Sequence, residues 1–305
     1  MVFDAYEWSK KIIKEDLKLI STIRNDRQIT SPGDIWSLKK FFITKYCIDD
    51  FVSIFKKFFK NYYYFDTHCG TGLIKFNEQL LKDTRFSRSC LISLTHPTKF
   101  TKYFLFDNNE EFIHTLSNRI EKLNNNILDV EFSIEKKEFS DSVNIIQNYN
   151  NANSGFLVII DPVEFKEIHW NLMEKILHVK TTDIIFSFMT HAMARNRSIS
   201  ELNNNYGKLF TSFFGNEDWI DALTGEDLMI LYVNKLKRYK KFVYRIPVYQ
   251  TGKQINYHIL IATNSNGANN VIKDAQKITQ VNNKLLIDAL KVVTGIQTEI
   301  NDYFE

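Results

Sequence analysis

The sequence predicts an α/β fold with a mostly parallel central sheet, added N-terminal helices and an antiparallel C-terminal strand pair. Short runs rich in aromatic and β-branched residues recur along the chain, and stretches with helical periodicity separate them. Several of these runs are apolar almost throughout, which is typical of strands that helices cover on both faces. Strands that alternate with helices in this way favour a parallel sheet.

Two helices are expected ahead of the first strand. One lies around residues 6–23, and the other covers residues 36–59, where apolar residues mostly recur at steps of three and four. Between them, Ser31-Pro-Gly-Asp34 contains residues that break helices and favour turns.

The sheet is expected to begin after these helices. Five short runs predict parallel strands, and two later runs, joined by the turn 251–254, predict the antiparallel pair. Pro247 indicates that its strand lies at an edge of the sheet or carries a bulge. The expected strands are 62–65, 103–106, 130–134, 156–160, 183–188, 242–249 and 257–262, with helices at 110–123 and 170–178.

The composition is that of an ordinary globular protein. The 305 residues are 44% hydrophobic and 25% charged, and no apolar run approaches the roughly 18 residues of a membrane span. Met1-Val-Phe-Asp-Ala lacks a signal-peptide pattern, so we expect a cytoplasmic protein without membrane contact. Three cysteines without CxxC spacing predict neither a disulfide framework nor a metal site.

A glycine-containing turn follows the first expected strand, in Asp66-Thr-His-Cys-Gly-Thr-Gly72. Ligands of parallel sheets bind outside the carboxyl ends of the strands. Gly70 and Gly72 permit a tight turn and let the backbone approach a nucleoside closely. Asp66 is expected at the rim, where it could meet the ammonium of a methionine moiety, and His68 adjoins the same site. A structural strand-to-helix turn is the alternative interpretation.

Carboxylates follow the next two strands. Asp107 could accept hydrogen bonds from both ribose hydroxyls, and Glu138 could accept one from an adenine amino group, although a solvated loop explains Glu138 equally well. Residues 73–88 predict a long loop before a helix that begins near Ser89. A diphosphate needs a helix N-terminus directly after the glycines, so this spacing favours S-adenosylmethionine over a dinucleotide.

The fourth strand runs into Asp161-Pro-Val-Glu-Phe165. Pro162 fixes the backbone and removes an amide donor, so that carbonyl and carboxylate acceptors can point into the cleft. Such acceptors suit an attacking amine. Asp161 is therefore the candidate for positioning a substrate and Glu164 a weaker candidate base, and the alternative is an Asp-Pro turn that only ends a strand.

The pattern resembles the three-Cys-motif partner proteins (TcmP). The resemblance covers about residues 36–197 and depends on Trp36-Ser-Leu-Lys with Tyr46, 64–72, 87–94, Phe106-Asp107, Ile160-Asp-Pro162, Trp170 and Arg195. It implies a Rossmann-like class I methyltransferase fold, S-adenosylmethionine as methyl donor and a radical-S-adenosylmethionine protein as partner. The glycine turn departs from the family, whose usual sequence there is Asp-hydrophobic-Ala-Gly-Pro-Gly.

These observations predict three parts of the chain. Residues 1–60 form an N-terminal helical extension, residues 61–264 a Rossmann-like catalytic domain with an insertion near 198–228, and residues 265–305 C-terminal helices. The first functional hypothesis is a methyltransferase that acts on a nucleic-acid base or another amine. A non-catalytic module that binds a protein partner is the second, and a nucleotide-dependent oxidoreductase is the third.

A basic segment near the end of the sheet predicts a second property. Cationic groups interleaved with aromatic rings are a common way to hold single-stranded nucleic acid. The alternative is a charged helix end followed by an edge strand that lysines protect. The basic residues are Lys235, Lys237, Arg238, Lys240, Lys241 and Arg245.

Overall fold

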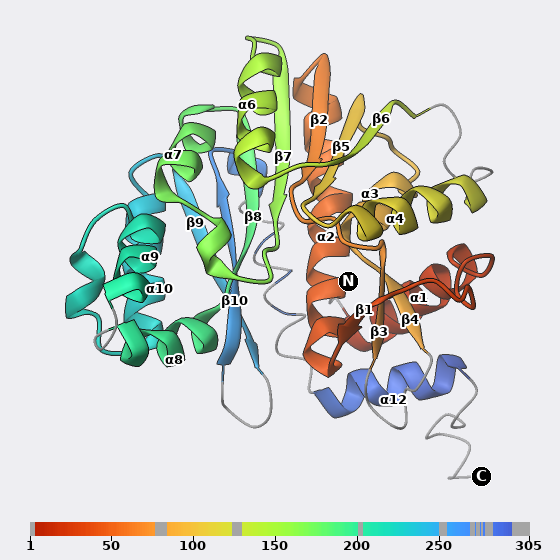
Figure 1. Ribbon diagram of the computed structural model, residues 1–305. Helices are drawn as coiled ribbons and strands as arrows, with labels where there is room; N and C mark the ends of the chain where they lie inside the picture. The colour runs from red at the N-terminus through yellow and green to blue at the C-terminus, as the bar shows by residue number, and fades with distance from the viewer. Residues whose placement is uncertain are drawn as a thin grey trace.

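The computed structural model describes residues 4–76, 84–123, 130–200, 204–249, 255–268 and 283–294, together with single positions at 272, 275 and 277. Its centre is a seven-stranded sheet with the strand order β6-β5-β2-β7-β8-β10-β9 (Figure 1). All neighbouring strands pair in parallel except β10, which is antiparallel to β8 and β9. The mostly parallel sheet and its antiparallel end are therefore confirmed.

The seven strands agree closely with the expected runs. Pro247 lies on the last strand of the sheet, so the expected edge position is confirmed. The strands are β2 (Asn61–Asp66), β5 (Lys102–Asp107), β6 (Phe132–Lys136), β7 (Ser154–Ile160), β8 (Thr182–Phe188), β9 (Phe242–Tyr249) and β10 (Ile255–Thr263).

Two helices precede the sheet, as the hydrophobic periodicity indicates. They are α1 (Ala5–Leu19) and α2 (Ile35–Phe58). Asp34 and Ser37 form a capping box that begins α2, because each side chain bonds the backbone of the other residue. Near the other end of the described chain, α12 (Asn283–Thr294) packs beside α1 (Figure 1).

The remaining helices connect the strands. Thr224 caps α10 with a capping box, and Asn109 caps α4 through its side chain. The connecting helices are α3 (Ser89–Leu94), α4 (Glu110–Lys122), α6 (Phe139–Tyr149), α7 (Trp170–His178), α8 (Thr190–Ser200), α9 (Asn204–Phe214) and α10 (Gly225–Leu236), with short 3-10 turns η2 (Phe165–Glu167) and η3 (Asp218–Asp221).

The sheet separates two hydrophobic cores, because successive side chains of a strand point to opposite faces. Tyr64 packs in the core that contains α1, α2, α3 and α12, whereas its neighbour Phe65 packs against α6 and α7 on the other face. On β10, the neighbours Ile259 and Leu260 likewise lie in different cores, Ile259 with Tyr64 and Leu260 with Phe65. Helices on both faces thus explain why several strands are apolar almost throughout.

The segment after the glycine turn is not the long loop that the sequence predicts. It contains β3 (Leu73–Phe76) and β4 (Arg85–Ser87), which form a three-stranded sheet with β1 (Ser31–Gly33). The prediction was wrong because these strands are short and complete their pairing with a distant segment. Residues 77–83 lie outside the described residues, and the expected helix at Ser89 is confirmed.

The described part of the predicted insertion near 198–228 is helical and contributes to the core on the α6 and α7 face of the sheet. Phe210, Phe213 and Phe214 of α9 and Leu228 of α10 are buried with the apolar residues of β8. Residues 201–203, the turn 250–254 and much of the predicted C-terminal helical region fall outside the described residues.

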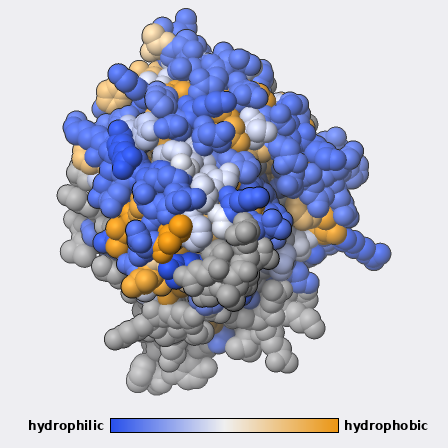
Figure 2. Space-filling view, turned by 60° about the vertical axis from the view of Figure 1, so that its left-hand side comes forward, coloured by the Kyte–Doolittle hydropathy of each residue, from blue (hydrophilic) through white to orange (hydrophobic). Residues whose placement is uncertain are grey.

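The outer surface is mainly hydrophilic on the face shown in Figure 2, where hydrophobic residues form small separate groups. Within the described residues, no helix combines the length and apolar composition that a membrane crossing requires.

Candidate functional site

A large cleft of about 1160 Å³ opens at the carboxyl ends of β2, β5 and β7. It lies at the point where the strand order reverses, since β5 and β6 extend to one side of β2 and β7 and β8 to the other. Residues from the glycine turn, from the starts of α4 and α6, and from the segment after β7 line it.

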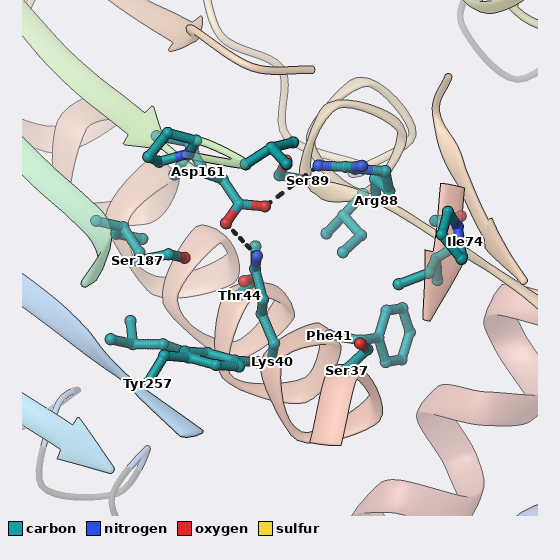
Figure 3. Close-up of a pocket in the computed structure, with 18 residues that line it drawn as sticks. Ser37, Lys40, Phe41, Thr44, Ile74, Arg88, Ser89, Asp161, Ser187 and Tyr257 are labelled. Carbon is teal, nitrogen blue, oxygen red and sulfur yellow. Dashed lines mark hydrogen bonds and ion pairs between the residues drawn. The ribbon is translucent and has the colours of Figure 1, made fainter. Parts of the chain in front are cut away.

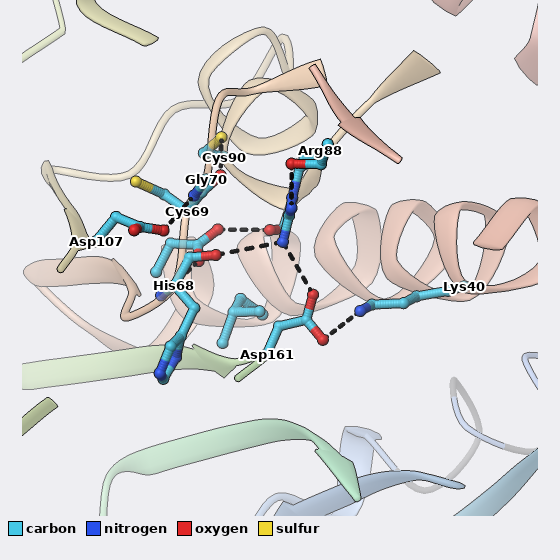
Figure 4. Close-up of polar contacts among 12 residues, drawn as sticks. Lys40, His68, Cys69, Gly70, Arg88, Cys90, Asp107 and Asp161 are labelled. Carbon is cyan, nitrogen blue, oxygen red and sulfur yellow. Dashed lines mark hydrogen bonds and ion pairs between the residues drawn. The ribbon is translucent and has the colours of Figure 1, made fainter. Parts of the chain in front are cut away.

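Gly70 is the glycine that faces this cleft. Its φ of +61° lies in the left-handed region that favours glycine. A Cβ atom there would lie 2.8 Å from Nη1 of Arg88. Its amide donates a 2.9 Å hydrogen bond to Oδ2 of Asp107, which joins the turn to the end of β5 (Figure 4). Gly70 thus brings backbone, cation and carboxylate close together.

Gly72 permits the tight turn that the sequence predicts, and it faces the interior. Its φ is +83°, and a Cβ atom would lie 2.7 Å from Leu116 Cδ1 and 3.2 Å from Leu91 Cδ1. It is absent from the described lining of the cleft. Gly72 therefore allows α3 and α4 to pack closely beneath the turn.

Asp66 lies in the interior, so its expected position at the rim is wrong. Its carboxylate accepts hydrogen bonds from Ser89 Oγ at 2.5 Å, Tyr64 Oη at 3.2 Å and the His68 amide at 3.4 Å. Burial raises the pKa of Asp66 above its ordinary value, although Ser89 and Arg88 oppose this shift. The carboxylate holds the turn from beneath, and contact with a cofactor ammonium stays a prediction.

Asp107 and Glu138 both line the large cleft. Asp107 is nearly buried, and its two oxygens accept hydrogen bonds from the amides of Gly70 and, at 3.0 Å, Asn109. A carboxylate oxygen has two lone pairs, so each retains one acceptor position. Glu138 is exposed and begins α6 through a capping box with Asp141.

His68 also lines the cleft, beside Phe139. Its Nδ1 lies 2.8 Å from Thr67 Oγ1 and its Nε2 lies 3.2 Å from Glu167 Oε2. The His68 and Phe139 rings stack with centroids 6.1 Å apart. Phe139 therefore provides an apolar part of the wall, and His68 beside it provides a polar part.

Asp161 stands between two cations at the end of β7. Lys40 Nζ of α2 pairs with Oδ1, and Arg88 Nη2 lies 3.2 Å from Oδ2 (Figure 4). Burial raises the pKa of Asp161, but Lys40, Arg88 and a hydrogen bond from Ser187 together outweigh it and lower the pKa to about 2. Asp161 is therefore a stable anion at neutral pH.

A small hollow of about 210 Å³ lies on the other side of this ion-paired cluster (Figure 3). Pro32, Arg88, Asp161 and Val163 line both spaces, so the two meet at the Arg88–Asp161 pair. The remaining walls of the small hollow come mainly from α2, β8 and β10, and include Ser37, Phe41, Thr44, Ile92, Ser187 and Tyr257.

The other two candidate residues after β7, Pro162 and Glu164, line different spaces. Pro162 lines the small hollow, whereas Glu164 lines the large cleft. The Glu164 side chain is 53% exposed and pairs with Lys166. The structure therefore brings Asp161 to the junction of the two spaces, places Pro162 in the wall of the small hollow and leaves Glu164 at the outer edge of the large cleft.

Arg88 and Lys40 are the charged groups that sequence reasoning missed. Arg88 also donates hydrogen bonds to Ser31 Oγ at 2.8 Å and the His68 carbonyl at 3.4 Å, so it links the N-terminal segment to the glycine turn. Its position directly before an apolar helix is a sequence signal by which Arg88 could have been found. Nothing in the sequence distinguishes Lys40 from Lys39, its neighbour on the same amphipathic helix.

The predicted basic segment is only partly at the surface. Lys235 is buried, donates to the Phe214 carbonyl and lies 4.3 Å from the Trp170 ring centroid. Lys240 is buried and donates to the carbonyls of Val179 and Thr182. Nucleic-acid binding stays a prediction, with Lys237, Arg238, Lys241 and Arg245 as its exposed cations.

The strand order and the cleft define the fold class. Five parallel strands with a reversal beside the glycine turn, followed by an antiparallel strand next to a parallel edge strand, form a Rossmann-like class I methyltransferase fold. No family model matches the chain, and no curated protein matches it.

Several solved structures align with most of this chain. Protein LPL1258 from Legionella pneumophila is 11% identical, with a TM-score of 0.46 over 82% of this chain and 91% of that chain. An O-methyltransferase from Bacillus cereus, solved with S-adenosylhomocysteine, is 15% identical, with a TM-score of 0.40 over 84% and 90%. The bifunctional kinase-methyltransferase WbdD is 12% identical, with a TM-score of 0.43 over 81% of this chain but 46% of WbdD. At these values the alignments add nothing to what the strand order shows.

Proposed function

We propose that this protein is an S-adenosylmethionine-dependent methyltransferase, with the cofactor in the large cleft and the methyl acceptor in the small hollow. The observation that carries the proposal is the junction of the two spaces at Arg88 and Asp161. A methyl transfer needs donor and acceptor on opposite sides of one point, held in alignment. The large cleft and the small hollow share lining residues at the end of β7, which supports this arrangement.

The residues of the large cleft fit the chemical groups of S-adenosylmethionine. The remaining acceptor positions of Asp107 suit ribose hydroxyls. Phe139 offers an apolar surface for adenine, with Glu138 close by as a hydrogen-bond acceptor. Gly70 has no side chain, so the cleft is free at this point of a group that would collide with Arg88.

The protein's own contribution to the reaction is positioning. S-adenosylmethionine, when bound, supplies a methyl group on a sulfonium that is already activated. Asp161 holds Lys40 and Arg88 at the junction. An amine acceptor, which the Asp-Pro motif favours, would compete with these two cations for the same carboxylate.

Calorimetric titration with S-adenosylmethionine and S-adenosylhomocysteine tests the cofactor assignment. Wild-type protein should bind both, and Asp107→Asn should weaken binding about tenfold because it removes a charged acceptor. Glu110→Gln is the matched control, since Glu110 lies on α4 nearby but outside the described lining of the cleft. Absence of binding at millimolar ligand would refute the enzyme and support the non-catalytic, partner-binding module.

A further inference from the structure

The charge of the small hollow is the feature that the proposed function leaves unexplained. Among its described lining residues the charged side chains are Lys40, Arg88 and Asp161, so two cations face one anion. The other lining groups are apolar side chains and hydroxyls, including Phe41, Tyr257 and Ser187. Two cations and one anion therefore lie in a mainly apolar wall, and Arg88 also interacts electrostatically with the buried Asp66.

Asp161 cannot serve an amine acceptor well as a base. Each of its two oxygens is already paired with a cation, and its pKa of about 2 makes the carboxylate a weak proton acceptor. An ammonium group would also meet two like charges at short range, which disfavours its binding. An occupant that arrives as an anion has no proton to give up and is attracted by the same cations.

Lys40 has the donors to hold such an anion. An ammonium group carries three N–H donors, and Asp161 accepts from one of them. Lys40 Nζ also lies 5.7 Å from the centroid of the Tyr257 ring, on the wall of the hollow. Figure 3 shows Lys40 extending from α2 to Asp161, with Ser187 and Tyr257 on one side and Phe41 on the other. Within the described part of the chain, two of its donors remain for an occupant.

We propose that the small hollow binds a small organic acid, with its carboxylate on Lys40 and Arg88 and an unsaturated ring against Phe41, Ile92 and Tyr257. This inference rests on the proposed function in one respect, that the acid is the methyl acceptor. A dry cavity of about 150 Å³ accepts benzene. The hollow, at about 210 Å³, has room for one ring and a carboxylate.

Methylation of a carboxylate is balanced without a base. One oxygen lone pair forms the new O–C bond, the electron pair of the broken S–C bond stays on sulfur, and no proton moves. The ester product is neutral, so it loses its attraction to Lys40 and Arg88 and can leave the hollow.

Binding of benzoate, benzyl alcohol and benzylamine to the full chain tests the inference, measured by ligand-observed NMR with and without S-adenosylhomocysteine. Benzoate should bind about tenfold more tightly than either of the other two, because it alone forms charge-assisted hydrogen bonds. Lys40→Met should abolish most of this preference, and Lys40→Arg should retain it. Lys45→Met is the matched control, because Lys45 lies on the same helix and pairs with Asp49 away from the hollow.

Three results would overturn the inference: no benzoate binding, benzylamine binding as tight as benzoate binding, or a benzoate preference that survives Lys40→Met. Benzoate binding without any binding of S-adenosylhomocysteine would refute the proposed methyltransferase while leaving the acid site in place. Binding of S-adenosylhomocysteine alone would do the reverse.

Discussion

The large cleft and the small hollow meet at one ion pair but differ in how the chain builds them. Asp107 of the large cleft is the last residue of β5, and Gly70 and Asp161 follow the ends of β2 and β7. The small hollow combines Lys40 of α2 and Tyr257 of β10, which are more than two hundred positions apart in the sequence. One space is a product of sheet topology, and the other depends on packing of the N-terminal extension against the sheet.

Removing the shared carboxylate should have the largest effect. Asp161→Ala leaves Lys40 and Arg88 without their common partner, and loss of one partner from a buried ionic cluster costs about 3 kcal/mol. Urea unfolding monitored by circular dichroism measures the change. Asp49→Ala, which removes a more exposed partner of Lys45 and His96, should cost less than about 1 kcal/mol. Equal losses would show that the Asp161 cluster is not a special junction.

Acid should weaken the strand that forms one wall of the small hollow. Burial lowers the pKa of His258 on β10 from 6.5 to about 4, and Nδ1 of its ring lies 2.7 Å from Thr190 Oγ1. The unfolded chain therefore binds this proton first, so stability is complete above pH 6.5 and falls as the pH drops towards 4, by on the order of 2 kcal/mol.

Urea unfolding of wild type and His258→Gln between pH 7 and pH 4.5 isolates this contribution, because all other groups titrate in both proteins. The wild type should lose more stability than the variant. Parallel losses in the two proteins would contradict the role of His258.

The two glycines of the turn should separate binding from packing. Left-handed backbone costs alanine about 1–2 kcal/mol, so Gly70→Ala and Gly72→Ala should both destabilise the protein. Only the Cβ of Gly70→Ala meets Arg88 in the large cleft, whereas that of Gly72→Ala meets Leu91 and Leu116. Calorimetry should therefore show weaker S-adenosylhomocysteine binding for Gly70→Ala alone. The reverse order would mean that Gly72 faces the cofactor.

Glu164→Gln should have the smallest effect. The side chain is half exposed and pairs with Lys166, so we expect less than about 0.5 kcal/mol of destabilisation. If Glu164 were the proton acceptor that its sequence position suggests, methyl transfer would fall about a hundredfold. A radiolabelled methyl-transfer assay on an identified acceptor distinguishes the two outcomes.

The strands and the large cleft could be predicted from sequence because their signals are local. Apolar runs mark the strands, and the parallel topology then brings Asp107 and Asp161 to one edge of the sheet. The buried position of Asp66 could not be predicted from sequence, since it depends on the hydrogen bonds that Ser89 and Tyr64 donate to its carboxylate.

The small hollow could not be predicted because its signals are tertiary. Lys40 has the same local pattern as any lysine of an amphipathic helix, and only the packing of α2 against the sheet brings it to Asp161. The strands β1, β3 and β4 were not predicted for a related reason. Each is three or four residues long and is stabilised by pairing within their small sheet. Short segments whose partners are distant carry almost no periodic signal.

A crystal structure of the protein with S-adenosylhomocysteine tests the central claim most directly. The account predicts the ribose hydroxyls on Asp107, adenine beside Phe139 and the sulfur atom directed towards the Arg88–Asp161 pair. Electron density for the ligand on any other surface, or a large cleft without ligand at saturating concentration, would contradict it.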